Sequence, residues 1–208
     1  MSQIHVVDHP LVKHHLTVLR NEASDCFQFR YALHQLTRFV AVEASKDLQV
    51  KEVLVKTPIQ MTSGHEVNGR IGLVPILRAG VAMVEPVLEL IPNSEVWHLG
   101  MYRDEKTAKP VWYYSKLIPG RPVDFAFILD PMLATGGSAV SACKCLLDWG
   151  VSQIRMLSII SAPEGISRLT EEIPHLSIYT CAVDEGLNEN NFIVPGLGDA
   201  GDRVFNTL

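Results

Sequence analysis

The sequence lacks the patterns that identify several common classes of nucleotide-binding and metal-binding protein. It contains no G-x-x-x-x-G-K-[ST] segment, so a Walker-type phosphate loop is excluded. Its four cysteines include no C-x-x-C pair, and Cys143 and Cys145 have a spacing that places them on different faces of a helix. A zinc knuckle or a redox dithiol is therefore not indicated, and we expect four reduced thiols.

Signals for membranes and nucleic acids are scarce as well. No apolar run approaches the roughly 20 residues that span a bilayer. The first residues, MSQIHVVDHPLVKHHL, do not combine a charged region with a following apolar one. The net charge is −5 and no cluster of Lys and Arg is present, which argues against nucleic acid or an anionic membrane as a partner. We expect a soluble cytoplasmic protein, and a local basic pocket for a small anionic substrate is compatible with this charge.

Apolar segments along the chain alternate between the periods of strands and helices. The 208 residues are 47% hydrophobic, which suits a single domain with a buried core. Strand-like segments occupy residues 48–55, 71–77, 95–101, 125–130, 154–161 and 177–183, and helical segments occupy 81–90, 138–149 and 164–172. This alternation predicts an α/β fold with an open, mostly parallel, doubly wound sheet.

The two ends of the chain depart from this alternation. We expect an N-terminal arm and helix at about 1–50, an α/β core at about 70–183 and a loop-rich cap at about 184–208. Asp25 with Gln28 is typical of a helix start, and an apolar stripe follows at Phe29, Leu33, Leu36 and Val40. Four early histidines, at 5, 9, 14 and 15, have no cysteine or acidic framework beside them, so we interpret them as part of a solvated arm.

Residues 125–141, FAFILDPMLATGGSAVS, carry the most specific functional signal. An apolar strand ends at Asp130, where ligands of open α/β sheets bind. The loop then leads through Thr135-Gly136-Gly137-Ser138 into a helix, whose unpaired N–H groups and dipole favour an anion. The glycines let the backbone close on a phosphate, and the hydroxyls add donors. The segment differs from the G-x-G-x-x-G fingerprint and predicts a phosphate cradle.

Two arginines are expected at the ends of neighbouring strands. Arg78 follows the 71–77 segment and Arg103 follows the 95–101 segment. Each alone is equally typical of a solvated turn. Because the carboxyl ends of parallel strands share one edge of a sheet, however, both guanidinium groups and Asp130 fall where a single polyanionic ligand would lie.

The C-terminal segment, PGLGDAGDRVFNT, supplies a glycine-rich loop that lets backbone groups approach a ligand. Together with HPLVKHHL, VPILRAG, GMYRDE, ILDPMLATGGS, APEGI and DEGLNE, it resembles the uracil phosphoribosyltransferase family of type I phosphoribosyltransferases. The matching segments extend over nearly the whole chain in the family's order, and the tail is diagnostic of the uracil enzymes within the wider superfamily.

The resemblance implies pyrimidine salvage. The 5-phosphoribosyl group of 5-phosphoribosyl-1-pyrophosphate (PRPP) moves to N1 of uracil through an oxocarbenium-like transition state, giving UMP and pyrophosphate. The implied PRPP-binding residues are Arg78, Arg103, Asp130, Pro131, Met132, Leu133, Ala134, Thr135, Gly136, Gly137, Ser138 and Asp199. The implied uracil-binding residues are Ile193, Gly198, Asp199 and Ala200. Asp130, Arg103 and Asp199 are the candidate catalytic residues, the last as a candidate general base.

The resemblance also implies Mg²⁺ as a cofactor. Many superfamily members have two adjacent acids at the strand end, whereas Pro131 follows Asp130 here. We therefore expect no direct protein ligand, with the ion held mainly by PRPP oxygens and water. The family further implies a homo-oligomer, either dimer or tetramer, and a possible GTP effector, although no motif in the sequence marks a GTP site.

Two other functions stay open on the sequence alone. A regulatory RNA-binding protein built on the same fold would need a basic face, which the net charge of −5 argues against. A phosphoribosyltransferase for another base, such as a purine, is disfavoured by the PGLGDAGD tail.

Overall fold

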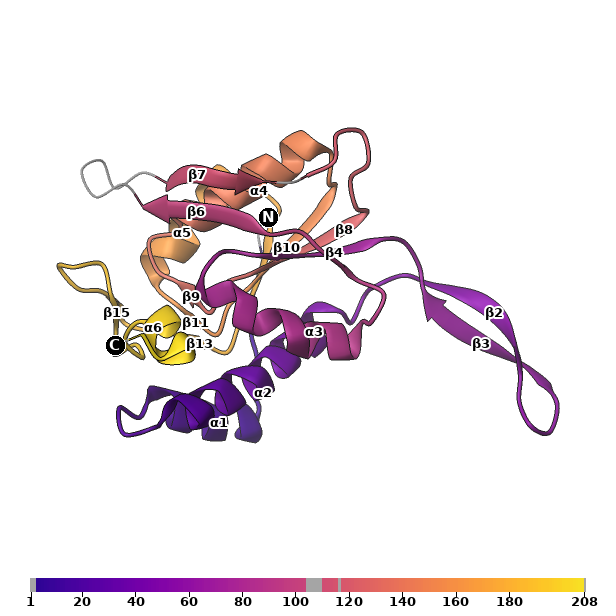
Figure 1. The fold of residues 1–208 in the computed structure, drawn as a ribbon, viewed down its shortest axis with the longest axis horizontal. Helices are drawn as coiled ribbons and strands as arrows, with labels where there is room; N and C mark the ends of the chain where they lie inside the picture. The colour runs from indigo at the N-terminus through magenta and orange to yellow at the C-terminus, as the bar shows by residue number, and fades with distance from the viewer. Residues whose placement is uncertain (1–2, 104–109, 116, 208) are drawn as a thin grey trace.

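The central element of the fold is a parallel sheet. The computed structural model describes residues 3–103, 110–115 and 117–207, with the backbone alone at 101–103 and 110–115. Among these residues, six strands form one sheet in the order β1, β12, β10, β8, β4, β5, and all neighbours are parallel. They are β1 (Gln3–Val6), β4 (Ile71–Pro75), β5 (Glu95–Val96), β8 (Phe125–Leu129), β10 (Gln153–Leu157) and β12 (Ser177–Thr180). The predicted α/β architecture is confirmed (Figure 1).

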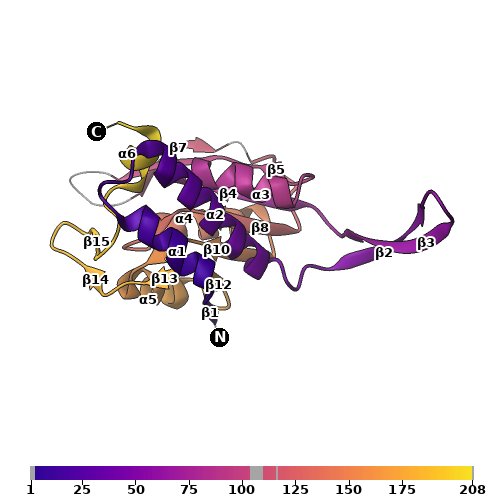
Figure 2. The same ribbon diagram turned by 90° about the horizontal axis from the view of Figure 1, so that it is seen from below.

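Helices cover both faces of the sheet, as a doubly wound fold requires (Figures 1 and 2). On one face lie α1 (Pro10–Arg20), α2 (Cys26–Ala44) and α3 (Val84–Leu90), which follows the 3₁₀ turn η1 (Ala79–Met83). On the other lie α4 (Gly137–Trp149) and α5 (Pro163–Glu172). The period of two along β8 divides its side chains, so that Phe125, Phe127 and Leu129 join the first core and Ala126 and Ile128 join the second.

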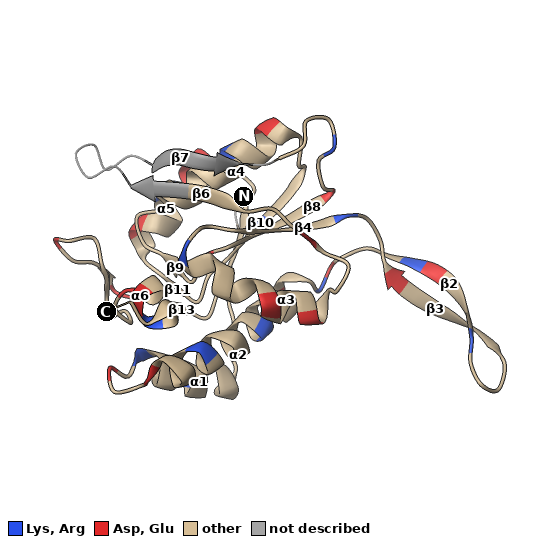
Figure 3. Ribbon diagram, viewed as in Figure 1, with Lys and Arg blue, Asp and Glu red and all other residues tan. Residues whose placement is uncertain are grey.

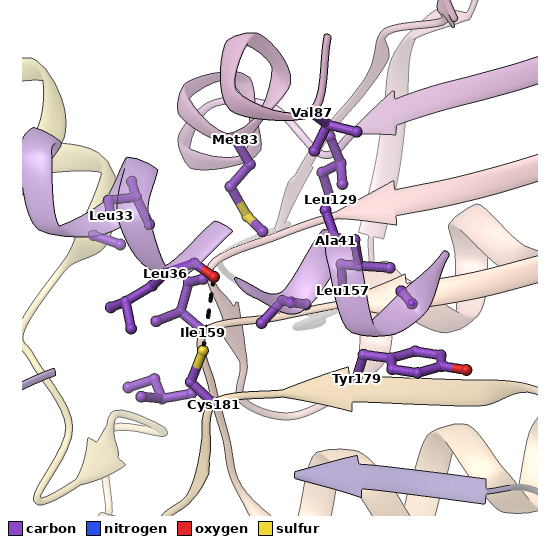
Figure 4. Packing of buried hydrophobic residues seen from close by; sticks show 14 of the residues in the cluster. Leu33, Leu36, Ala41, Met83, Val87, Leu129, Leu157, Ile159, Tyr179 and Cys181 are labelled. Carbon is purple, nitrogen blue, oxygen red and sulfur yellow. Dashed lines mark hydrogen bonds between the residues drawn. The ribbon is translucent and has the colours of Figure 1, made fainter. Parts of the chain in front are cut away.

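The α2 helix begins where the sequence predicts. Asp25 accepts the N–H of Gln28 at 2.8 Å, and the Gln28 side chain accepts the N–H of Asp25 at 3.0 Å, which forms a capping box. The predicted apolar stripe is buried in the core, and Figure 4 shows Leu33 and Leu36 packed among the sheet residues. Cys181 lies below them, with its Sγ 3.9 Å from the Leu36 carbonyl oxygen. None of the four cysteines, all within the described ranges, forms a disulfide.

The N-terminal residues differ from the expectation of a solvated arm. Residues 3–6 form β1, which extends the sheet by pairing with β12 from Gln3 to Val6. His5 stacks on Tyr179 with the ring centroids 4.4 Å apart, and His9 caps α1 by accepting the N–H of Leu11 at 3.1 Å. The reason is that the open edge of β12 supplies unpaired backbone groups, which the pattern of residues 3–6 alone does not reveal.

Two hairpins in the chain between α2 and β8 lie outside the main sheet. β2 (Val50–Lys56) pairs antiparallel with β3 (Met61–Val67), and this hairpin projects from the body of the molecule (Figure 1). The predicted 48–55 strand therefore exists but does not join the parallel sheet. The predicted 95–101 strand divides, because β5 stays in the sheet while β6 (Leu99–Arg103) pairs with β7 (Pro110–Ser115). Residues 104–109 and 116 lie outside the described residues.

The cap contains more regular structure than the loop-rich expectation. It includes β14 (Gly186–Leu187), β15 (Ile193–Val194) and the unpredicted α6 (Ala200–Phe205). Between cap and main sheet lie β9 (Met132–Leu133), β11 (Ile160–Ser161) and β13 (Ala182–Val183), a small parallel sheet beyond the carboxyl ends of β8, β10 and β12. In the described part of the chain, no helix has the length and hydropathy needed to span a bilayer.

Candidate active site at the carboxyl edge of the sheet

The loop that the sequence predicts to form a phosphate cradle lies at the start of α4. The helix begins after Gly136, whose φ of +74° is favourable only for glycine, and no described side chain caps it. Its first N–H groups are therefore available to an anion. The loop encloses a cavity of about 90 Å³. The lining residues are Asp130, Met132, Leu133, Ala134, Thr135, Gly136, Gly137, Ser138 and Ala139.

Helix α5 supports the cradle from behind. A Cβ built on Gly165 would lie 2.3 Å from the carbonyl oxygen of Ala134, and one built on Gly136 would lie 2.8 Å from the carbonyl oxygen of Gly165. The two backbones therefore approach closer than any side chain permits. A Cβ built on Gly137 would lie 3.2 Å from Nη1 of Arg168 on α5. The Arg168 guanidinium therefore lies beside the start of α4. The sequence analysis did not identify this residue.

Asp130 occupies the break between β8 and β9. Its N–H donates to the Leu157 carbonyl at 3.2 Å, and its Oδ1 accepts the N–H of Met132 at 3.3 Å. Loss of hydration raises the pKa of this carboxyl to about 7, and the Met132 hydrogen bond offsets the increase only in part. The group therefore titrates near neutral pH, in the lining of the cradle.

Arg78 lies beside the same edge, in the loop after β4. The neighbouring Gly80 permits this, since a Cβ there would lie 2.2 Å from the carbonyl oxygen of Leu129 at the end of β8. Arg78 Nη2 donates to Oδ1 of Asp202 on α6 at 3.0 Å. Arg103 is the last residue of β6, whose first residue, Leu99, bridges to Ile76. The Arg103 side chain lies outside what the structure describes.

The residues expected to bind uracil lie in the cap, which approaches Arg78 at the start of α6. Ile193 is buried in β15, and Ala200 is buried at the start of α6. Asp199 caps α6 by accepting the N–H of Asp202 at 2.9 Å, and Gly198 has a φ of +79°. A Cβ built on Gly201 would lie 3.2 Å from Oδ1 of Asp199 and 3.5 Å from Nη2 of Arg78, so the cap and the arginine loop meet there.

The structure also identifies groups that the sequence reading missed. Arg20 and Asp184 form an ion pair under the cap loop, and Arg203 binds carbonyl groups of the same region. Glu164, next to Gly165 on α5, accepts the N–H of Leu187 at 3.1 Å and so joins the cradle support to the cap. Most of their partners are distant in sequence, so local spacing does not identify these contacts.

Acidic ligands for a metal are sparse at this edge. Within the described residues, no group of three or more His, Cys, Asp or Glu side chains could together hold an ion. Asp130 is the acid that lines the cradle cavity. A single carboxylate at this place fits an Mg²⁺ ion that takes most of its ligands from phosphate oxygens and water.

Comparisons with known proteins agree with this geometry. The uracil phosphoribosyltransferase family profile matches residues 6–207. A uracil phosphoribosyltransferase from Roseiflexus sp. (strain RS-1) is 51% identical over 207 residues, and one from Campylobacter fetus is 45% identical over 208 residues. Each match covers 100% of both chains. A solved protein from Aquifex aeolicus has a TM-score of 0.92 and 37% identity, covering 98% of both chains.

A more distant match concerns the fold alone. A hypoxanthine phosphoribosyltransferase from Staphylococcus aureus has a TM-score of 0.50 at 13% identity, covering 74% of both chains. The family profile and the full-length relatives reach much further, since they span nearly all of the chain at substantial identity. The chain belongs to the uracil phosphoribosyltransferase family.

Proposed function

We propose that this protein transfers the 5-phosphoribosyl group of PRPP to N1 of uracil in the cytoplasm, as a step of pyrimidine salvage. The products are UMP and pyrophosphate. The observation that carries the proposal is that Asp130 and the uncapped start of α4 follow β8, while Arg78 follows its parallel neighbour β4 and contacts the cap. Membership of the family supports the same reaction.

PRPP binds along the carboxyl edge of the sheet in this proposal. Its 5-phosphate lies in the cradle, where the first N–H groups of α4 and the hydroxyls of Thr135 and Ser138 donate hydrogen bonds. Its ribose hydroxyls donate to Asp130, which borders the same cavity. Residues 131–134 connect the two and shape the cavity wall.

The leaving pyrophosphate accumulates negative charge as the C1–O bond breaks. In this proposal Arg78, after β4, and Arg103, the last residue of β6, stabilise that charge. Strand β6 lies outside the main sheet, and its first residue, Leu99, bridges to Ile76 in the segment after β4. Mg²⁺, bound through PRPP, supplies a further positive charge to the leaving group. The remaining task of the protein is to hold uracil N1 against C1 and to exclude water, so no nucleophilic side chain is needed.

Main-chain groups of Ile193 and residues 198–200 read the base. Uracil presents an acceptor, a donor and an acceptor at O4, N3 and O2, whereas cytosine reverses the pattern at positions 3 and 4. A site built on such hydrogen bonds can reject the mispaired analogue by about 10⁴-fold. The Asp199 carboxylate already accepts an N–H of α6, which favours a role in shaping this site over a role as general base.

We also propose that the protein is a homo-oligomer and that the β2–β3 hairpin contributes to its interface. Leu54, Ile59 and Met61 are 80%, 89% and 56% exposed, and a projecting apolar hairpin is typical of an association surface. Light scattering of the wild type and of Leu54→Glu tests this. A dimer or tetramer that dissociates on substitution supports it, whereas a monomeric wild type or an unchanged oligomer contradicts it.

The direct test of the function is UMP formation from uracil and PRPP. Product that depends on Mg²⁺ supports the proposal, and a folded protein that forms no UMP with Mg²⁺, with or without GTP, contradicts it. The same assay with added GTP decides whether GTP is an effector.

Two further assays address the alternatives. Hypoxanthine in place of uracil tests the purine reading, and RNA retention on filters at graded salt tests the regulatory reading. Acidic and basic residues are interspersed along the described elements (Figure 3), which favours the enzyme over an RNA-binding protein.

A further inference from the structure

Arg20, the last residue of α1, forms a two-armed ion pair with Asp184 below the cap. Its Nη2 lies 2.5 Å from Oδ1, and its Nη1 lies 2.8 Å from Oδ2, across 164 residues of sequence. The two side chains are only 26% and 3% exposed. Burying such a pair costs desolvation free energy that the attraction only partly returns, so stability alone is a weak explanation for it. The geometry, in contrast, is strict, because the guanidinium fork matches a carboxylate in one plane.

The same pair holds both polar groups of Gly196. Arg20 Nη1 donates to the Gly196 carbonyl at 2.8 Å, and the Gly196 N–H donates to Oδ2 of Asp184 at 3.0 Å. Gly196 has a φ of +66°, and a Cβ there would lie 2.1 Å from the carbonyl oxygen of Ile193. The backbone at Gly196 therefore packs closely against β15, and the charged side chains of Arg20 and Asp184 hold its carbonyl and N–H groups.

Gly196 lies between the two halves of the proposed uracil site, Ile193 and residues 198–200. Because the proposed readers are main-chain groups, their directions follow from the orientation of the loop. A second arginine anchors the next residue, since Arg203 Nη1 donates to the Leu197 carbonyl at 2.8 Å and to the Leu19 carbonyl at 2.7 Å. Gly196 is thus held by the last residue of α1, and Leu197 is held by an arginine of α6 that also binds the end of α1.

We propose that Arg20 and Asp184 are positioning residues for base recognition. They keep the loop in the shape that pairs with uracil, without contact to the base. This rests on the proposed function, since it requires uracil to bind at residues 193 and 198–200. Affinity for uracil and its preference over cytosine then depend on the pair. Use of PRPP depends on it much less, because the cradle lies on α4 and is supported by α5.

Arg155 provides a matched control. Its Nη1 and Nη2 pair with Oδ1 and Oδ2 of Asp47 at 2.5 and 2.7 Å, and Nη1 also donates to the carbonyl of Ala44. The Arg155 side chain is 11% exposed. The groups are the same, a guanidinium fork, a carboxylate and a main-chain carbonyl, although Asp47 is 68% exposed. This pair joins β10 to the segment after α2 rather than to the cap.

The experiment compares the wild type with Arg20→Lys, Asp184→Asn and Arg155→Lys, varying uracil and PRPP separately and offering cytosine as a rival base. Lysine keeps the charge of Arg20 but loses the fork. We expect Arg20→Lys to raise the KM for uracil roughly tenfold and to lower the uracil-to-cytosine ratio. We expect the KM for PRPP to stay within about twofold. Asp184→Asn, an independent route to the same loss, should give the same split.

Thermal unfolding of each variant verifies that it is folded, and Arg155→Lys should leave both KM values unchanged. The proposal is overturned if Arg20→Lys and Asp184→Asn both leave the KM for uracil unchanged. It is also overturned if the two KM values rise together, or if Arg155→Lys produces the same split. Absence of UMP from the wild-type protein instead refutes the proposed function, and this proposal with it.

Discussion

Arg78 and Asp202 form an ion pair that joins the loop after β4 to the cap, with Nη2 of the arginine 3.0 Å from Oδ1 of the aspartate. The Thr207 hydroxyl donates to the same oxygen at 2.7 Å. The hydrogen bond from Thr207, followed by that from Arg78, holds the pKa of Asp202 below its ordinary value. The carboxylate is therefore ionised at neutral pH. Since Arg78 is also the proposed partner of pyrophosphate, Asp202 and PRPP compete for one guanidinium.

We therefore expect Asp202→Asn to lower the KM for PRPP. An amide competes less strongly than a carboxylate, and partly exposed ion pairs are weak, so a decrease of about two- to fivefold is expected. Thr207→Val is the control, because it removes the other hydrogen bond of Oδ1 and leaves the Arg78 contact. The measurement is the initial rate with varied PRPP at saturating uracil. A raised KM in Asp202→Asn would mean that the pair orients Arg78 instead of competing for it.

The raised pKa of Asp130 predicts a pH-dependent stability. An acid whose pKa is about 7 in the folded state and near its usual value in the unfolded state binds its proton more tightly when folded. Stability from this group is therefore full at low pH and is lost as the pH rises through about 7. At each pH, the quantity of interest is the unfolding free energy of Asp130→Asn minus that of the wild type. We expect this difference to be roughly 2 kcal/mol larger at pH 8 than at pH 5. Urea denaturation of both proteins at the two pH values measures it, and a constant difference would contradict the assignment.

The sheet and the glycine turn at the start of α4 were predictable from the sequence because they depend on local patterns. The apolar runs of β4 and β8 are of strand length, and both faces of each strand are buried, so their composition alone identifies them. The rule that ligands bind at the carboxyl ends of parallel strands then brings Arg78 and Asp130 to one edge. The structure places both there.

The parts that sequence reasoning missed depend on partners distant in the chain. Arg20 is a terminal residue of an amphipathic helix, and only the fold brings it to Asp184. Strand β1 is exposed along most of its length and gains its structure from the edge of β12. Helix α6 has six residues, too few for an apolar period to be recognised. These elements shape the cap. The sequence could therefore indicate which cap residues form the proposed uracil site, but not the contacts that hold them in place.

Asp130 also predicts the pH dependence of catalysis. Ribose hydroxyls donate to a carboxylate more strongly than to a neutral acid, so PRPP favours the ionised form. Because the pKa of the free enzyme's carboxyl is about 7, kcat/KM for PRPP should rise with pH through that value. In Asp130→Asn the rise attributable to this group should disappear, and kcat/KM should fall roughly 10- to 100-fold. An unchanged kcat/KM would refute the ribose role.

Gly165 sets two physical effects against each other. Gly165 lies in the first turn of α5. In a helix interior alanine is favoured over glycine by about 1 kcal/mol, and a smaller preference of the same sign in the first turn alone predicts a more stable protein. The Cβ of Gly165→Ala would, however, lie 2.3 Å from the carbonyl oxygen of Ala134, a backbone atom of the cradle. Relieving such overpacking costs typically about 1–3 kcal/mol and requires the loop to move.

We expect the collision to prevail, with a lower unfolding temperature and a KM for PRPP raised roughly tenfold. Gly120→Ala is the control, because Gly120 has a φ of +71° with nothing within 4 Å of the added Cβ. It should lose stability through backbone strain and leave the KM for PRPP unchanged. A Gly165→Ala protein that is more stable and binds PRPP normally would mean that the loop can yield without losing its ligand. The conformation of the cradle loop would then depend on the turn at Gly136 and not on packing against α5.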